Sequence, residues 1–164
     1  TPSEIEAVAA LPFVRAVETP MAMRVLMDVM FAAPWGRQAW MAYYKTLYIS
    51  SPPADHDAHL QHLAENLAVP GRMDVVRAMM RASKAAAAAQ APHVRAPVLV
   101  AMGSRDPDFK DPAAEAKLVA DSLHGGVQMI EGAGHYPHAE MPAPTGSALL
   151  TFLGTLQEAE RHVA

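Results

Sequence analysis

The sequence predicts an α/β fold with two parts: a helical part over residues 1–90, and two parallel strands with helices over residues 91–164. Two observations support this. Apolar residues recur at helical spacing through the first part. Near Ala91–Pro97 the period changes, and short continuous apolar runs then alternate with amphipathic segments. The order strand, helix, strand, helix implies parallel strands joined by a right-handed crossover.

The first part is expected to begin with two helices. One covers Met21–Phe31, with Met23, Leu26, Met27 and Met30 at helical spacing, and Pro34-Trp35-Gly36 breaks it. An aromatic stripe at positions i, i+3, i+4, i+7 and i+8 predicts the second; it consists of Trp40, Tyr43, Tyr44, Leu47 and Tyr48. Ser50-Ser51-Pro52-Pro53 is expected to end it.

Two further helices complete the first part. Asp55 is in position to cap the third helix, which should end at Pro70-Gly71. The fourth is predicted over Met73–Ala89.

The second part has strand signals at both of its apolar runs. Val98–Met102 lies between Pro97 and Gly103 and is typical of a strand buried on both faces of a parallel sheet. Val127–Ile130 is the second strand.

The helix between the strands should start at Asp111-Pro112, with Asp as N-cap, and end at Gly125-Gly126. The last helix carries Leu149, Phe152, Leu153 and Leu156.

The predicted sheet lacks cover. Two buried parallel strands need further strands and helices over their faces and edges. The preceding residues offer helices only. The rest of the sheet is therefore expected from another segment or chain.

Composition excludes several classes of protein. Hydrophobic residues are 51% and charged residues 18%, which is a globular composition. The net charge of -4 offers no basic surplus, so neither nucleic acid nor an anionic membrane is an expected partner. No apolar run reaches about 18 residues. The absence of cysteine rules out disulfides and a Cys nucleophile, and favours a cytoplasmic location.

Acidic and histidine side chains follow the two strands. Gly103-Ser104-Arg105-Asp106 comes after the first strand, and Gly132-Ala133-Gly134-His135 after the second. Functional groups gather at the carboxyl ends of parallel strands, so Asp106 and His135 are expected to hydrogen-bond. The carboxylate would fix the imidazole tautomer and leave the other ring nitrogen as a base.

These motifs resemble the C-terminal half of the α/β-hydrolase superfamily, over residues 97–156. In that family the acid follows the last-but-one strand as G-x-x-D, and the histidine follows the last strand as G-x-G-H. Asp106 and His135 occupy the matching positions, and Glu140-Met141-Pro142 resembles the family's Glu-x-Pro. Asp108 is a rival acid, but Asp106 fits the pattern. The resemblance implies that residues 1–90 are a cap inserted before the acid strand, and implies no cofactor.

The sequence departs from the family at the nucleophile. No serine lies in a G-x-S-x-G elbow. Because Ser precedes Asp and His in the family order, we expect this chain to be the C-terminal part of a hydrolase. The nucleophile and the oxyanion loop would then lie on a cleaved upstream segment or on a separate chain in a heterodimer. A carboxylate nucleophile there, as in dehalogenases or epoxide hydrolases, stays open.

The resemblance implies hydrolysis of small ester, thioester or acyl substrates, and the hydrophobic residues of the cap indicate that these substrates are apolar. His135 would act as general base and then general acid, and Asp106 would stabilise it. Four aromatic residues of the cap are candidate substrate contacts: Trp35, Trp40, Tyr43 and Tyr44.

Other interpretations differ from this one in function or in fold. The alternative function is a non-catalytic ligand-binding or interaction module on a hydrolase-like scaffold. A complete helical protein with a small βα tail would leave the strands uncovered. No metal site is expected, because the spacing of His56, His59 and His62 drifts around a helix.

Overall fold

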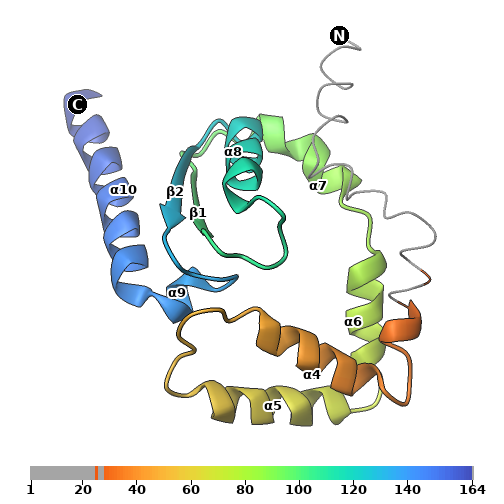
Figure 1. Ribbon diagram of the computed structural model, residues 1–164. Helices are drawn as coiled ribbons and strands as arrows, with labels where there is room; N and C mark the ends of the chain where they lie inside the picture. Colours follow the sequence, from red (N-terminus) through yellow and green to blue (C-terminus); the bar gives the residue numbers. More distant parts are fainter. Residues whose placement is uncertain (1–24, 26–27, 164) are drawn as a thin grey trace. The chain divides into compact units, whose positions relative to one another are not determined.

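The structure, a computed structural model, describes Val25 and residues 28–163 (Figure 1). They divide into two compact units. One comprises the described part of Thr1–Thr46 together with Pro53–Ala88. The other comprises Leu47–Pro52 together with the described residues from Ala89 onward. Leu47–Pro52, which the sequence assigned to the helical part, therefore belongs to the same unit as the strands.

The first unit is helical. It contains α4 (Gly36–Thr46), α5 (His56–Ala68) and α6 (Arg72–Arg81), and most of α7 (Ala85–Gln90). Helix α5 contacts both α4 and α6. Phe31 and Leu67 are buried, and the Phe31 ring meets Trp40 edge-on, with centroids 5.4 Å apart.

The helices of the first unit differ from the expectations in three places. Helix α4 ends at Thr46, so Leu47 and Tyr48 do not continue the aromatic stripe; the Leu47 carbonyl instead accepts a hydrogen bond from the His135 amide. Asp55 stands at the N-cap of α5, but its side chain makes no capping bond. The helix predicted over 73–89 is broken at Ala82–Lys84, where the Ser83 hydroxyl accepts from the Ala85 amide.

The helix predicted over Met21–Phe31 lies mostly outside the described residues. Met23, Leu26 and Met27 are among the residues that are not described, while Val25 and residues 28–30 are helical.

The second unit contains a two-stranded parallel sheet within the described residues. Strand β1 (Leu99–Gly103) pairs with β2 (Gly126–Ile130), in a register that runs from Leu99 opposite Gly126 to Gly103 opposite Ile130. Helices α8 (Pro112–Ser122) and α10 (Pro142–Val163) both contact the strands, and the sheet lies between them in Figure 1. A short 3₁₀ helix, η1 (Ala91–His93), precedes β1, and a short helix, α9 (Pro137–Glu140), precedes α10.

The ends of α8 are set by local chemistry. Asp111 Oδ1 accepts from the Ala114 amide at 3.0 Å, which confirms the predicted N-cap. At the other end the left-handed residue is His124 (φ 54°), not one of the two glycines. The Gly125 amide donates back to the Ala120 carbonyl at 2.8 Å, which completes a Schellman-type cap. Gly126 then begins β2.

The strands are less covered than the sequence predicts. Residues 99–102 of β1 are half-buried, and Val127 on β2 is 41% exposed. Three leucines of α10 are exposed as well: Leu149, Leu150 and Leu153. Full burial is not reached because, among the described residues, α8 and α10 are the helices that pack on both strands. No helix of the described part is both long and apolar enough to cross a bilayer.

Candidate active site

The loops that follow β1 and β2 are joined by main-chain hydrogen bonds. The Ser104 amide donates to the Ile130 carbonyl at 3.0 Å, and the Arg105 amide to the Ala133 carbonyl at 2.9 Å. The Ser104 hydroxyl accepts from the Gly132 amide at 2.8 Å. These bonds bring both predicted site residues to the same edge of the sheet.

The two loops approach so closely at Gly103 that no side chain fits there. A Cβ on Gly103 would lie 2.0 Å from the Gly134 carbonyl oxygen and 2.4 Å from that of Ala133. Glycine at the end of β1 therefore permits the close approach that places the acid loop beside the histidine loop.

The structure brings Asp106 and His135 together. His135 Nδ1 lies 2.9 Å from Asp106 Oδ2 and 3.0 Å from Oδ1. Asp106 is buried, with 5% of its side chain exposed, while 33% of the His135 side chain is exposed. Asp106 Oδ1 also accepts from the Asp108 amide at 3.0 Å, which fixes the carboxylate from within its own loop. The buried member of the pair can orient the imidazole, and the accessible member can meet a ligand.

Asp108, the rival acid, lies further from the imidazole. Its Oδ2 is 3.6 Å from His135 Nδ1, and 29% of its side chain is exposed. The three side chains of Asp106, Asp108 and His135 place potential metal-ligand atoms within 4.8 Å of one another. The close Asp106–His135 contact is that of a hydrogen-bonded pair.

Glu140 supports the loop that contains His135 by accepting hydrogen bonds. Glu140 is buried, with 5% of the residue exposed. Oε1 accepts from the Gly134 amide at 2.8 Å, and Oε2 accepts from the amides of Ile49 and Ser50, each at 2.9 Å, and from the Ser50 hydroxyl at 3.0 Å. Burial raises the pKa of Glu140, but the hydrogen bonds from Ser50, Ile49 and Gly134 outweigh it and hold that pKa below its ordinary value.

Acid should weaken the fold through Glu140. Because its folded pKa lies below 4.5, the ionised carboxylate stabilises the folded state fully above about pH 4.5, and this stability is lost as the pH falls through the folded pKa. We expect the free energy of unfolding, measured in urea between pH 3 and pH 7, to fall on the acid side. Glu140→Gln should be less stable at pH 7 and should lose part of that acid dependence. An equal acid dependence in the variant would contradict the assignment.

An aromatic cluster borders the imidazole. The Tyr136 ring lies 5.1 Å from the rings of both Tyr48 and His135, and 6.0 Å from that of His138. Sequence reasoning missed Tyr48 and Tyr136 as neighbours of the site. Tyr136 was identifiable from its position next to His135, whereas Tyr48 had no local signal.

The four cap residues predicted to contact substrate lie in the first unit. Trp35 is exposed and donates to the Val29 carbonyl at 2.9 Å. Trp40 packs between Phe31 and Tyr43, with ring centroids 5.4 and 5.6 Å away. The Tyr44 hydroxyl lies 3.0 Å from His59 Nε2. Their contact with substrate stays a prediction.

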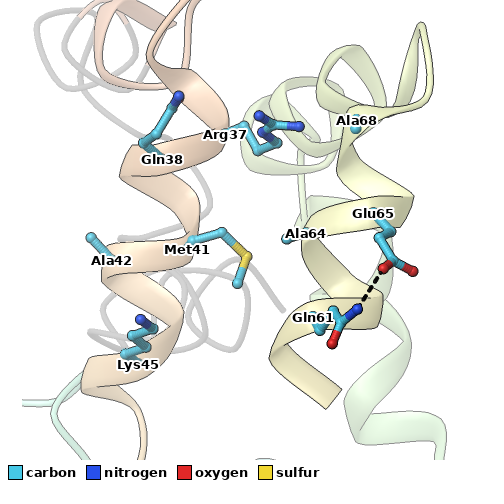
Figure 2. A pocket seen from close by; sticks show the side chains of 9 residues that line it. All are labelled: Arg37, Gln38, Met41, Ala42, Lys45, Gln61, Ala64, Glu65 and Ala68. Atoms are coloured by element: carbon cyan, nitrogen blue, oxygen red, sulfur yellow. Dashed lines mark hydrogen bonds between the residues drawn. The ribbon is translucent and has the colours of Figure 1, made fainter. Parts of the chain in front are cut away.

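Within the part of the chain that the structure describes, one cavity of the first unit lies between α4 and α5 and another lies beside Phe31. The larger, about 640 Å³, lies between α4 and α5, and Figure 2 shows Met41 directed across it. Its lining consists of Arg37, Gln38, Met41, Ala42, Lys45, Gln61, Ala64, Glu65 and Ala68. The smaller, about 120 Å³, lies beside Phe31 and Arg77. Neither cavity is lined by the four predicted aromatic residues.

The histidines of α5 make separate contacts. His59 meets Tyr44, and His62 Nδ1 lies 3.7 Å from Glu65 Oε2. Within the described residues they form no common group of potential metal ligands with His56.

Comparison with known proteins gives one result, at the level of fold. No protein-family model and no curated protein matches the sequence. Among solved structures, the fold is similar to that of a membrane phospholipase A, described as a bacterial virulence factor, with a TM-score of 0.55 and 18% identity. The match covers 74% of this chain and 39% of the phospholipase chain. The chain thus spans about two fifths of that protein, and the likeness is one of mixed α/β fold.

Proposed function

We propose that this chain is the C-terminal part of an α/β-hydrolase that cleaves small apolar esters, thioesters or similar acyl compounds. The observation that carries the proposal is the Asp106–His135 hydrogen bond at the ends of two adjacent parallel strands. A Ser-His-Asp triad uses such a hydrogen-bonded pair as its acid and its histidine, which supports the proposal. The similar solved structure is that of a membrane phospholipase A, which also favours ester chemistry.

In this proposal each of the two residues has one role. Asp106 accepts from Nδ1–H of His135, so the other ring nitrogen, Nε2, is free of the proton and acts as the base. His135 removes the proton from a serine hydroxyl, whose oxygen bonds to the acyl carbon. His135 then gives that proton to the departing alcohol or thiol. A water molecule then gives a proton to His135 while its oxygen bonds to the acyl carbon. The bond from that carbon to the serine oxygen breaks, the acid product leaves, and His135 returns the proton to the serine oxygen.

The serine and the oxyanion-binding amides are proposed to lie on an upstream segment or a partner chain. The exposed leucines of α10 and the exposed Val127 on β2 support this, because parallel sheets are covered on both faces in stable folds. Cover from further strands and helices would also place a nucleophile at the same sheet edge as Asp106 and His135.

The first test is the composition of the native particle. Native and denaturing mass spectrometry of the purified protein should reveal a longer polypeptide or a second chain that carries a nucleophile. A folded monomer of this chain by itself, without hydrolytic activity, would overturn the split triad and favour the binding-module alternative.

The second test concerns His135. His135→Ala should lower kcat for p-nitrophenyl ester hydrolysis by about 10³-fold or more, because the general base is lost. His124→Ala, an exposed histidine at the end of α8, is the matched control and should retain activity. Full activity in His135→Ala would refute the proposal.

A further inference from the structure

Glu140 is a buried carboxylate whose hydrogen-bond donors are all uncharged groups. No described residue forms an ion pair with it. Its four hydrogen-bond donors are three main-chain amides and one hydroxyl, from Ile49, Ser50 and Gly134. A buried charge without a counter-ion is costly unless its hydrogen bonds are made well. Both oxygens of a carboxylate accept hydrogen bonds. A role that needs an acceptor at each oxygen would explain why a carboxylate occupies this position.

The donors come from two segments that are far apart in the sequence. Ile49 and Ser50 lie in the stretch that follows α4, and Gly134 directly precedes His135. The His135 amide itself donates to the Leu47 carbonyl at 2.9 Å. The main chain of His135 is thus held on one side through Gly134, and on the other through the segment that Glu140 also binds.

The position of Glu140 is itself fixed. It ends the four-residue helix α9, which begins at Pro137. The Thr145 hydroxyl donates to the Pro137 carbonyl at 2.9 Å and joins this helix to α10. The Glu140 carboxylate therefore belongs to a helix that is itself held in place by a hydrogen bond from α10.

We propose that Glu140 is a positioning residue: it bridges the His135 loop to Leu47–Pro52 and so holds the imidazole against Asp106. The inference rests on the proposed function, since it gives His135 its catalytic placement. In this arrangement Leu47–Pro52, the segment that follows α4, also helps to hold His135 in place. A change in that segment would then reach the catalytic base through Gly134 and Leu47.

The substitution Glu140→Gln tests whether an acceptor is needed at each oxygen. A glutamine offers an acceptor at one end and an NH₂ donor at the other. The glutamine oxygen should face the three donors from Ile49 and Ser50, because this orientation keeps three hydrogen bonds and the opposite orientation keeps one. The NH₂ group would then face the Gly134 amide, donor against donor, and push the loop away. Glu131→Gln, an exposed acid in the same loop, is the matched control.

Two readouts are taken on the purified full-length protein with any partner chain. In Glu140→Gln, kcat for ester hydrolysis should fall by about 10- to 100-fold with little change in KM, because small misplacements of a catalytic group are costly. The titration of the His135 imidazole, followed by NMR, should shift. Ser50→Ala removes one of the four donors and should produce a smaller change in the same direction. Glu131→Gln should change neither readout.

The outcomes separate positioning from mere stability. If Glu140→Gln and Ser50→Ala lower the unfolding temperature but leave the His135 titration and kcat unchanged, the proposal is overturned. If Glu140→Gln does not fold, Ser50→Ala decides by the same two readouts. If His135→Ala itself has no effect on hydrolysis, the proposed function fails; a shifted His135 titration in Glu140→Gln would still support the positioning role.

Discussion

Replacing Asp106 by Asn should lower kcat for ester hydrolysis by about 10⁴-fold while leaving the fold in place. The carboxylate accepts from Nδ1–H of His135 at 2.9 Å. An amide of the same size can present its NH₂ group to Nδ1, which then must be unprotonated. The proton moves to Nε2, and the base that should take the serine proton is lost. The measurement is kcat and KM for a chromogenic ester, with circular dichroism to verify the fold.

Asp108→Asn is the matched control for this experiment. Its carboxylate lies 3.6 Å from the same nitrogen and is more exposed than that of Asp106, so about a tenfold loss or less is expected. An equal loss in both variants would make Asp108 a partner of equal weight. A loss confined to Asp108→Asn would transfer the role of the acid to that residue.

Gly134→Ala should lower the free energy of unfolding by about 3 kcal/mol or more. A Cβ at this position would lie 2.6 Å from the Leu47 carbonyl oxygen, 2.7 Å from Glu140 Oε1 and 3.0 Å from Ile49 Cγ1. The first two neighbours are a main-chain group and a fully hydrogen-bonded carboxylate, and neither can yield without breaking bonds. Urea unfolding measures the stability, and hydrolysis should fall with it because His135 is the next residue.

Gly146→Ala provides the contrasting variant. Gly146 lies inside α10, and a Cβ there would meet nothing within 4 Å. Alanine should therefore stabilise the protein by about 0.5–1 kcal/mol through the lower entropy of its unfolded chain. If Gly134→Ala proved as harmless as Gly146→Ala, the close packing of the histidine loop on Leu47–Pro52 would be wrong.

Local patterns were sufficient for much of the second unit. Val98–Met102 and Val127–Ile130 predicted the two strands to within a residue at either end, and Asp111-Pro112 predicted the start of α8. These features depend on neighbours in the sequence: an apolar run between breakers, or a side chain that reaches its own helix. The proximity of Asp106 and His135 followed from the rule that parallel strands end at one edge.

Helix boundaries in the first unit depended on competing interactions. The aromatic stripe through Tyr48 matches the helical period, yet helix α4 ends at Thr46. The next carbonyl, that of Leu47, accepts a hydrogen bond from the amide of His135, a residue 88 positions away. The run Met73–Ala89 has good helix propensity, but the chain leaves the helix at Ala82–Lys84, where the Ser83 hydroxyl accepts a hydrogen bond from the Ala85 amide. Hydrophobic periodicity predicts neither of these two hydrogen bonds.

Sequence patterns were enough to predict the class of fold, the order of strands and helices in residues 91–164, and which acid and histidine stand at the strand ends. Tertiary structure alone decided that Leu47–Pro52 joins the unit of the strands, and that Glu140 connects this segment to the His135 loop. The reason is physical. Strand ends and caps follow from local backbone chemistry, whereas the partners of a buried carboxylate are whichever main-chain donors the folded chain brings to it.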